Sequence, residues 1–463
     1  MTNHKILSFV KYKTIDNWSV SHIVGNKMWF NDLYPMVSIG DIIEKATNTI
    51  EIQDEAQYKQ VTLKTNGGGA VLRDVKYGRE IGTKKQYVVS EGQFIMSKID
   101  ARNGAFGVIT KELDGAIVTA DFPVFNVNTE IVLPQYLFLL SSSKCFAQFA
   151  QSCSRGTTNR QRIDVGLFLS QQIPLPPLSE QHRLFNEFEA NMQQATDNER
   201  QAAEIERDIE KYLLDELGII SKDNSSNNLD SKQSFVRFIR YKNIEKWGYD
   251  FIHNNDNVIV ETKYKNKRIS QLCSISSGGT PSRNRNDYYN GTIPWIKTGE
   301  LNNEVILDTE EKITQLGLVN SSAKLYPKDS IAIAMYGATI GKTAKFGIDA
   351  TTNQACAVLF NIDTKTILTD YLWIYLQYQT DNLKAMAYGG AQPNINAGIV
   401  ANYKIPIPPF SVQHDIVKNI NTQKVQIKQL QQAANNLRET AMKEFENEIF
   451  DNKNGSNYGK TTK

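Results

Sequence analysis

The sequence of 463 residues has no long hydrophobic run, although 40% of its residues are apolar. The apolar residues are scattered, and no stretch approaches the roughly 18 to 20 that a membrane-spanning helix requires. The first residues, MTNHKILSFVKYK, show no apolar stretch followed by a small-residue cleavage site. We therefore expect no membrane span, no secretion signal and a cytoplasmic protein of about two to four domains.

Cysteine and histidine are both scarce. The five histidines lie away from the four cysteines in the sequence, and no C-x-x-C pair occurs among Cys145, Cys153, Cys273 and Cys356. Structural metal sites need such ligands at short, regular spacing. The sequence therefore predicts no metal site, and we interpret the cysteines as small buried apolar side chains.

Catalytic motifs are missing as well. GATIGKT, which begins at Gly337, resembles a phosphate-binding loop, but Tyr336 stands where the first glycine belongs and the flanks are strand-like. The glycine triplet at 67–69 lacks the spacing of a dinucleotide-binding loop, and we predict a flexible turn there. No nucleophile elbow, zinc-protease motif or amino-methyltransferase tetrapeptide occurs. We predict that the chain is not an enzyme, with nucleotide hydrolysis at Lys342 as the enzymatic alternative.

The sequence does contain a tandem duplication. FVKYKTIDNW, starting at Phe9, recurs as FIRYKNIEKW, starting at Phe238. IPLPPLSEQH, starting at Ile173, returns as IPIPPFSVQH, starting at Ile405. Because the spacing between the copies is nearly the same for both pairs, the halves repeat over their full length. Each half is predicted to hold short β segments, then a proline segment, then a long helix.

The proline segments mark where the helices begin. Consecutive prolines cannot lie inside a helix, and Ser179 and Ser411 follow at the expected N-cap positions. Neither proline nor glycine interrupts residues 179–217, so we expect the first helix to extend about 60 Å.

Both helices carry a coiled-coil pattern. Alternate steps of four and three from Ile416 to Ala441 give eight positions, of which seven are apolar. The polar residues at matching positions, Asn191 and Gln423, either fix the register or mark a partly hydrated seam. We expect the helices to pack antiparallel and to act as a spacer between two similar domains. The seam also supplies our candidates for partner binding: Leu184, Phe188, Ile205, Ile209, Ile416, Ile420, Ile427 and Leu437.

The segment that starts at Ser277, SGGTPSRNRNDYYNGTIPWIKTGELN, is suited to nucleic acid. A net charge of only +2 excludes a uniformly basic surface but permits local basic faces. Arginine forks can bind guanine or phosphate, and the glycine pair would allow a close backbone approach. The alternative is a solvated turn whose aromatic residues belong to the core. The candidate contacts are Thr280, Ser282, Arg283, Arg285 and Lys297.

A second basic cluster precedes the first proline segment. Arg155, Arg160 and Arg162 lie among small polar residues and form a plausible phosphate clamp. The matching place in the second half is uncharged, and there Gln392 and Asn394 either read adenine or close a turn. Two domains with one scaffold and different surfaces would recognise different targets.

The quoted motifs resemble those of the DNA specificity subunit of type I restriction-modification systems. G-G-T-P-S-R with Y-Y-N-G-T-I-P-W-I-K-T-G-E-L is similar to the start of a target recognition domain, and I-P-L-P-P-L-S-E-Q to the start of the family's helical region. The resemblance implies that the second domain binds DNA through two groups of residues: Thr280, Ser282, Arg283 and Lys297, and Gly337, Thr339, Gly341 and Lys342.

The resemblance also implies partners. Two modification subunits would bring adenine-N6 methylation, and restriction or translocase subunits would join them on double-stranded DNA with a split target. S-adenosylmethionine, ATP and magnesium would bind those partners, and this chain would bind no cofactor. The first domain lacks G-G-T-P-S, so its expected contacts rest on Lys98, Arg102 and Asn103. The second helix starts with P-F-S-V-Q instead of P-L-S-E-Q, which could weaken one cap.

We predict an α+β fold with two target recognition domains separated by two antiparallel coiled-coil helices in a pseudo-twofold repeat. The functional alternative is a non-catalytic adaptor that docks partners through its duplicated helices. The expected boundaries are an N-terminal arm at 1–35, recognition domains at 36–153 and 266–386, helical regions at 154–220 and 387–450, a linker with the repeated aromatic opener at 221–265, and a disordered tail at 451–463.

Overall fold

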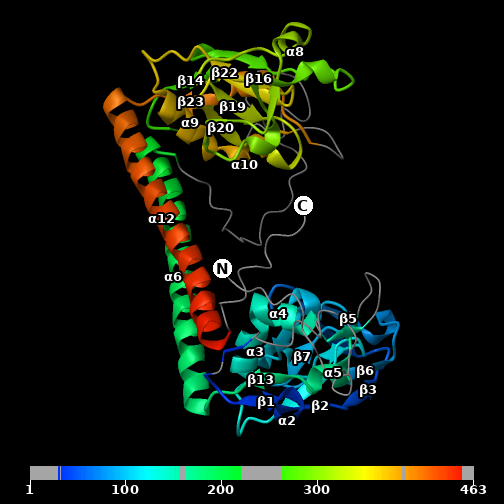
Figure 1. The fold of residues 1–463 in the computed structure, drawn as a ribbon. Helices are drawn as coiled ribbons and strands as arrows, with labels where there is room; N and C mark the ends of the chain where they lie inside the picture. Colours follow the sequence, from blue (N-terminus) through cyan, green and yellow to red (C-terminus); the bar gives the residue numbers. More distant parts are fainter. Residues whose placement is uncertain are drawn as a thin grey trace, which may run out of the picture. The chain divides into compact units, whose positions relative to one another are not determined.

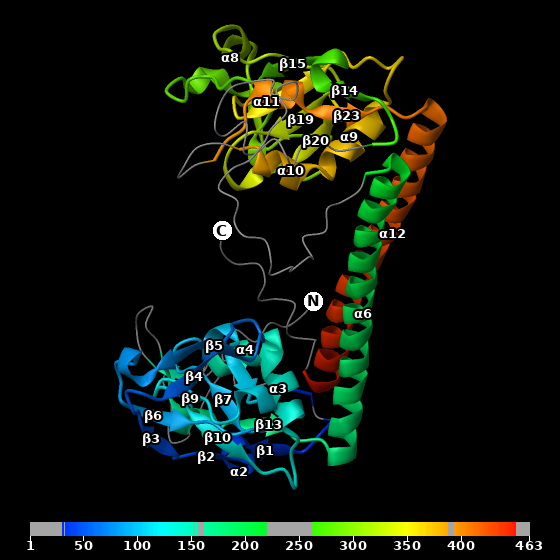
Figure 2. The same ribbon diagram turned by 180° about the vertical axis from the view of Figure 1, so that it is seen from behind.

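The computed structural model describes residues 30–31, 33–151, 153–155, 162–219, 262–387 and 393–450 (Figures 1 and 2). Two compact units divide the chain: unit 1 holds the residues up to Glu199 and from Gln431 onward, and unit 2 holds Arg200–Leu430. The repeated openers at Phe9 and Phe238 and the expected tail lie outside the described residues.

Unit 1 contains two sheets. The four-stranded sheet has the order β2 (Ile43–Lys45), β10 (Val124–Val127), β7 (Phe94–Met96) and β8 (Phe106–Val108). The five-stranded sheet has the order β3 (Thr49–Glu51), β6 (Lys85–Val88), β9 (Ile117–Val118), β4 (Gln57–Leu63) and β5 (Ala70–Tyr77). Successive side chains of a strand point to opposite faces. Phe94 and Met96 therefore pack with the helices α3 (Pro134–Ser142) and α4 (Lys144–Gln151), while Ile95 packs with Val61 of the second sheet.

Unit 2 repeats this plan. Its larger sheet has the order β15 (Ser274–Ser277), β22 (Cys356–Phe360), β19 (Ile331–Ala334), β20 (Thr343–Phe346) and β17 (Val305–Ile306). A smaller sheet has the order β18 (Glu311–Ile313), β16 (Tyr289–Ile296) and β21 (Thr351–Thr352). In β19, Ile331 and Ile333 pack with α9 (Thr369–Gln377) and α10 (Thr380–Ala385), while Ala332 packs on the other face. The β7–β8 and β19–β20 hairpins occupy matching places beside β10 and β22.

Each unit closes with a short strand pair at its proline segment. β1 (Met36–Ser38) pairs with β13 (Gln172–Pro174), and β14 (Asn266–Arg268) pairs with β23 (Lys404–Pro406), both antiparallel and in the same register. The remaining short elements are α2 (Ile39–Ile42), β11 (Ser154–Arg155), β12 (Arg162–Ile163), α5 (Val165–Leu169), α8 (Gln315–Val319) and α11 (Ala397–Asn402).

A buried glutamine joins each globular part to its long helix. Gln181 accepts a hydrogen bond from the Leu133 backbone N–H (2.8 Å) and donates to the carbonyl oxygens of Ile131 (3.0 Å) and Pro176 (2.8 Å). Its equivalent in the second copy of the repeat, Gln413, is likewise fully buried. Gln413 accepts from the Leu368 N–H and donates to the carbonyl oxygens of Thr366 and Pro408. The same joint therefore occurs in both units.

The two long helices are α6 (Leu178–Leu217) and α12 (Phe410–Ile449), each of 40 residues (Figure 1). The predicted serine caps are wrong. Each helix begins one residue earlier, and Ser179 and Ser411 lie inside it. The carbonyl oxygens of Pro177 and Pro409 accept the first helical hydrogen bonds, because a proline carbonyl remains an acceptor although its nitrogen carries no hydrogen.

The helices pack antiparallel within each unit, as predicted. In unit 1 Arg438 of α12 donates to Glu199 of α6 (2.8 Å), and Arg183 near the start of α6 pairs with Glu448 near the end of α12. In unit 2 Ile209 and Leu213 of α6 pack in one core with Ile416 and Ile420 of α12. The helix ends are also tied to the segments that lead into β1 and β14. The Ile449 carbonyl accepts from Asn31 N–H, and the Leu217 carbonyl accepts from Lys263 N–H, at closely corresponding places of the repeat.

Two of the four cysteines are buried and the other two are half-buried. Cys153 and Cys356 are buried, and burial raises the pKa of the Cys145 thiol to about 11 and that of Cys273 to about 12. Among the described residues no group of metal-binding side chains is found. The same residues include no helix with the length and apolarity needed to span a bilayer.

Candidate nucleic-acid interface

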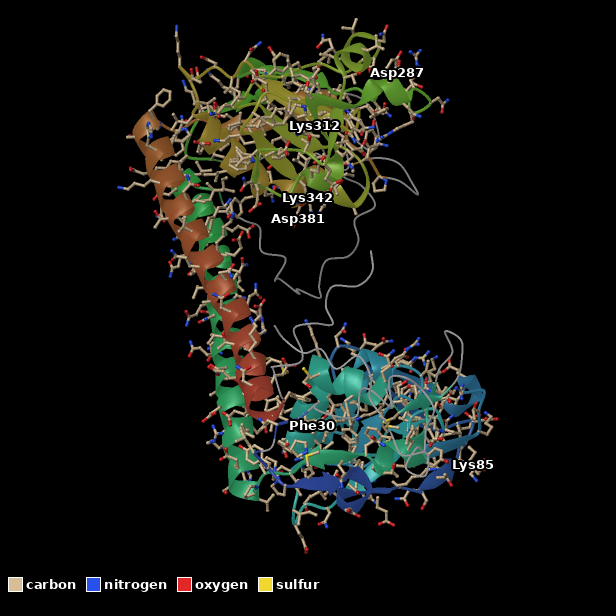
Figure 3. All side chains as sticks on the ribbon, in the orientation of Figure 1. Phe30, Lys85, Asp287, Lys312, Lys342 and Asp381 are labelled. Atoms are coloured by element: carbon tan, nitrogen blue, oxygen red, sulfur yellow. The ribbon has the colours of Figure 1, made fainter. Side chains whose placement is uncertain are left out.

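The β19–β20 turn of unit 2 presents the glycine-rich motif. It joins two antiparallel strands, which excludes the helix that a phosphate-binding loop must precede. Gly337 and Gly341 adopt φ values of 65° and 81°, a left-handed conformation that favours glycine. Thr339 Oγ1 donates to the Tyr336 carbonyl oxygen (3.1 Å), and Lys342 lies exposed at the surface of unit 2 (Figure 3).

Neighbouring segments hold this turn in place. Thr380, at the start of α10, donates through Oγ1 to the Gly341 carbonyl oxygen (3.2 Å). Tyr336 forms an antiparallel bridge with Asn394, and Ile395 N–H donates to the Met335 carbonyl oxygen (2.9 Å). The structure thus brings the turn and Asn394 together, while Gln392 lies outside the described residues.

The β7–β8 turn of unit 1 carries Lys98, Arg102 and Asn103. These residues were predicted without a recognisable motif, yet they lie on the hairpin that matches β19–β20. Ile163 N–H donates to the Lys98 carbonyl oxygen (2.9 Å), so Arg162 lies beside the turn. Arg162 and Asn394 occupy equivalent positions of the repeat, at the same spacing as Ile173 and Ile405. We name residues 97–104 with Arg162, and residues 336–342 with Asn394, the turn sites of units 1 and 2.

Two contacts hold residues of the turn site of unit 1. Asp121 forms an ion pair with Arg162 (3.2 Å), an acidic partner that the local sequence did not indicate. Asn103 is exposed, and its backbone carbonyl oxygen accepts from Asn66 N–H (2.7 Å). The side chain of Arg155 and all of Arg160 lie outside the described residues.

The glycine triplet at 67–69 was predicted to be a flexible turn. It is a turn, between β4 and β5, but it is docked: Gly67 N–H donates to the Gly104 carbonyl oxygen (3.2 Å). A Cβ on Gly67 would lie 2.8 Å from the Ser142 carbonyl oxygen. Glycine is therefore required by close packing and by φ values of 73° and 71° at Gly67 and Gly69.

The glycine pair at the start of the Ser277 segment also serves packing within the chain. A Cβ on Gly278 would lie 2.0 Å from Thr352 Oγ1, and a Cβ on Gly279 would lie 2.2 Å from the Ala323 nitrogen. Trp295 is 2% exposed and donates its ring N–H to the Gly279 carbonyl oxygen (3.0 Å). The close approach expected toward DNA is therefore made to the chain's own backbone, and the aromatic side chain belongs to the core.

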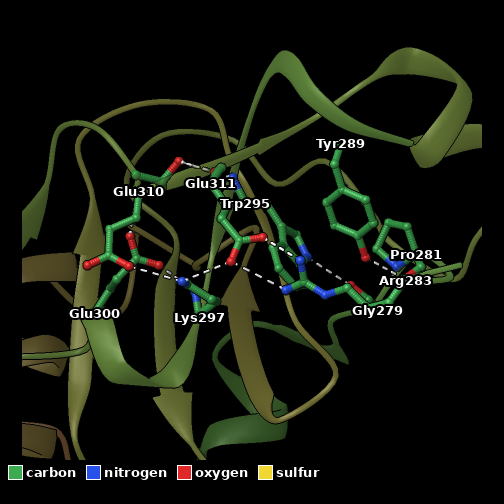
Figure 4. Close-up of polar contacts among 10 residues, drawn as sticks. Gly279, Pro281, Arg283, Tyr289, Trp295, Lys297, Glu300, Glu310 and Glu311 are labelled. Carbon is green, nitrogen blue, oxygen red and sulfur yellow. Dashed lines mark hydrogen bonds and ion pairs between the residues drawn. The ribbon is translucent and has the colours of Figure 1, made fainter. Parts of the chain in front are cut away.

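The cations of this segment have acidic partners (Figure 4). Arg283 binds Glu311 through both terminal nitrogens (2.7 and 3.4 Å). Lys297 Nζ binds Glu310 (2.9 Å) and Glu311 (3.0 Å). Hydrogen bonding to Arg283 lowers the pKa of the Glu311 carboxyl, and hydrogen bonding to Glu310 and Glu311 raises the pKa of Lys297. We name Arg283, Lys297, Glu300, Glu310 and Glu311 the charged cluster.

The acidic members of the charged cluster were not foreseen. Glu311 is opposite Trp295 because β16 pairs with β18, and no local sequence signal links the two strands. Arg285 binds Asp287 two residues away (2.7 Å), a partner that the sequence could have indicated. Thr280 is half-buried and Ser282 is exposed. The segment predicted to be basic is therefore neutralised where the structure describes it.

The predicted partner-binding residues lie inside the chain. Leu184, Ile209, Ile416, Ile420 and Ile427 are buried in the cores of their own units. Phe188, Ile205 and Leu437 are half-buried. All but Leu437 pack in these cores, and the contact of the eight residues with a partner stays a prediction.

Comparison with known proteins identifies the family. The family model described as "Type I restriction modification DNA specificity domain" matches residues 31–207 and 261–438, which is well over half of the chain and both copies of the repeat. The chain belongs to this family. It is a DNA specificity subunit of a type I restriction-modification system, and the family is the non-catalytic component of the complex.

Curated relatives and a solved structure agree with the family. The specificity subunit is 24% identical over 381 residues to the HindI specificity subunit of Haemophilus influenzae, covering 74% of this chain and 82% of that one. It is 26% identical over 227 residues to the EcoR124I/EcoR124II specificity subunit of Escherichia coli, covering 45% of this chain and 56% of the relative. A solved type I restriction-modification chain shares the fold, with a TM-score of 0.57, 18% identity, and coverage of 90% of this chain and 97% of that one.

Proposed function

We propose that each unit of the specificity subunit reads one half of a split double-stranded DNA site through its turn site. The main support is that the two turn sites occupy matching places in the repeat but differ in sequence. Lys342 would bind a phosphate, while Thr339 and Asn394 would lie near base edges. In unit 1, Lys98, Arg102, Asn103 and Arg162 would take these roles.

The remaining predicted contacts extend this proposal. Arg155 and Arg160 would add phosphate contacts next to the turn site of unit 1, and Gln392 would join Asn394 in unit 2. In the Ser277 segment, Thr280, Ser282 and Arg285 would contact the backbone of the same half-site. Gly337 and Gly341 would shape the turn without making side-chain contacts.

We further propose that two modification subunits bind this chain and methylate adenine in the chosen sequence. Restriction or translocase subunits would join them, and S-adenosylmethionine, ATP and magnesium would belong to these partners. The relatives support this proposal, since each is described as the specificity subunit of a type I restriction enzyme. Because most of the seam residues are buried, their part in docking would be to hold the helix pair together while exposed helix faces meet the partner.

Sequencing of N6-methyladenine in the host genome tests the proposed function. Deleting the gene for this chain should remove methylation from one split motif and leave other motifs modified. Restoring the gene on a plasmid should restore that motif. An unchanged methylation pattern, or loss of a single uninterrupted motif, would contradict the proposal.

A further inference from the structure

We infer that Glu311 is a positioning residue that fixes Arg283 as a base-reading side chain and keeps it from binding DNA phosphates. This inference rests on the proposed function, in which unit 2 reads DNA. Glu311 lies on β18, outside the Ser277 segment, and its carboxylate reaches a side chain of that segment.

The guanidinium of Arg283 is held on two sides. Its terminal nitrogens bind the Glu311 carboxylate, at 2.7 and 3.4 Å. Its central carbon lies 4.5 Å from the ring centroid of Tyr289 and 5.0 Å from that of Trp295. The Arg283 side chain is nevertheless 55% exposed. An arginine has five N–H donors, so those not used by Glu311 remain available to a ligand.

The platform beneath this pair is rigid. Trp295 is buried, and its ring N–H and backbone N–H are bonded to Gly279 and to Thr309. Glu311 is opposite Trp295 on the neighbouring strand, so both side chains project from the same face of the sheet. Tyr289 in turn donates its hydroxyl to the Pro281 carbonyl oxygen. Arg283 itself lies in a turn, and its side chain is oriented by contacts with Glu311, Tyr289 and Trp295, whose places are set by the pairing of β16 with β18.

The surrounding charge disfavours phosphate. The charged cluster holds two cations and three carboxylates, which gives a net charge of −1. Glu300 accepts from the backbone N–H groups of Lys297 (2.7 Å) and Glu310 (3.0 Å), which fixes the places of these residues. A phosphate approaching Arg283 would meet the carboxylate of Glu311 at close range. A guanine edge carries no net charge, so its O6 and N7 acceptors meet a weaker repulsion than a phosphate does.

The fixed orientation of Arg283 and the repulsion of phosphates by the nearby carboxylate together favour contact between Arg283 and a base. A free arginine reaches phosphates, which every DNA sequence offers, and it loses rotamer freedom on binding. An arginine already held in one orientation loses less freedom when it contacts a base edge at a fixed place. Removing Glu311 should therefore weaken the correct site and strengthen incorrect ones, so that the ratio of the two affinities falls.

The substitution Glu311→Gln tests this inference in the full chain bound to its modification partners. Duplexes that carry the correct site, the site changed in one half only, or a scrambled sequence would be titrated at several salt concentrations. We expect the preference for the correct half-site to fall about tenfold, which matches one base contact. Binding of the scrambled duplex should steepen in salt dependence by about one phosphate contact.

Matched variants distinguish the effect of holding Arg283 in place from the effect of removing one negative charge. Asp308→Asn removes the same charge three residues away, where Asp308 forms an ion pair with Lys312 (2.9 Å), and it should leave the preference unchanged. Arg283→Ala should lose the preference without the steeper salt dependence. Thermal unfolding of each variant would show whether the fold is retained.

Two outcomes would overturn the inference: an unchanged half-site preference in Glu311→Gln, or an equal loss in Asp308→Asn. Failure of the proposed function would look different, because the unsubstituted complex would then show no preference for a split site over the scrambled duplex. Methylation in the host gives a second readout. The Glu311→Gln strain should mark additional sites that differ from the normal motif in one half only.

Discussion

At the scale of single residues, whether a cation is free to bind DNA depends on acidic side chains that are distant in the sequence but close in the structure. Arg283 and Lys297 meet carboxylates that follow them by 28 and 13 or 14 residues, whereas Lys342 has no acidic partner among the described residues. Counting the basic residues of a segment therefore overestimates the number of cations that are available to bind DNA. The unpaired lysine on the turn is the better candidate for a phosphate contact.

Lys342→Ala should weaken DNA binding to a similar degree for all sequences. The expected cause is the loss of one phosphate contact, which should lower the salt slope by about one. Lys328→Ala, an exposed lysine of the same unit away from the turn, is the control. Salt titrations of both variants give the measurement, and an equal effect of the two would count against the turn site.

Gln413→Leu should destabilise unit 2 strongly. The substitution keeps the size of the side chain but leaves one backbone N–H and two carbonyl oxygens without their bonds. Each buried unsatisfied group costs roughly 1 to 3 kcal/mol, so a loss of about 3 kcal/mol or more in the free energy of unfolding is expected. Denaturant unfolding measures it. Gln426→Leu, at an exposed position of the same helix, should change little.

At the scale of elements, local signals were predictive and long-range pairing was not. The proline segments gave the helix starts to within two residues, and apolar spacing identified the inner faces of α6 and α12. The caps were misassigned because the second proline itself supplies the accepting carbonyl. The pairing of β16 with β18, which brings Glu311 to Arg283, depends on contacts that no local pattern records.

The glycine turn of unit 2 offers a test at this scale. Gly341→Ala would place a Cβ 3.0 Å from the Thr380 backbone at a φ of 81°, a strain of about 1 to 3 kcal/mol. We expect lower stability of the β19–β20 turn and weaker recognition of the half-site read by unit 2. Gly299→Ala is the control, since a Cβ there meets no atom within 4 Å.

Hydrogen exchange of the turn amides and methylation of the target motif measure these two effects of Gly341→Ala. Equal behaviour of the two alanine variants would contradict the structural role of Gly341.

At the scale of the whole molecule, the chain repeats its connections as well as its domains. The bond from Lys263 to the end of α6 has its equivalent in the bond from Asn31 to the end of α12. The second bond joins residues near opposite ends of the sequence. A hydrogen bond therefore joins the start of the first copy of the repeat to the end of the second copy, although no covalent bond links them.

A circular permutant tests this closure. Joining residue 450 to residue 30 through a flexible peptide and opening the chain within 220–261 should preserve both units and the methylated motif. The reason is that the new link follows a contact already present at Asn31 and Ile449. Opening the chain within α6 instead should abolish methylation, because it breaks a helix that both units share. Similar methylation by the two permutants would contradict the closure.

The glutamine joint has a consequence for how such subunits change over time. In the described part of the chain, the side chains of Gln181 and Gln413 hydrogen-bond to main-chain atoms of the neighbouring segments: the N–H of Leu133 or Leu368 and the carbonyl oxygen of Ile131 or Thr366. Any residue that keeps the backbone path can form these hydrogen bonds, except proline at 133 or 368, where the N–H is needed. The recognition surfaces can thus acquire new sequences, and new targets, while the attachment to the helices stays intact.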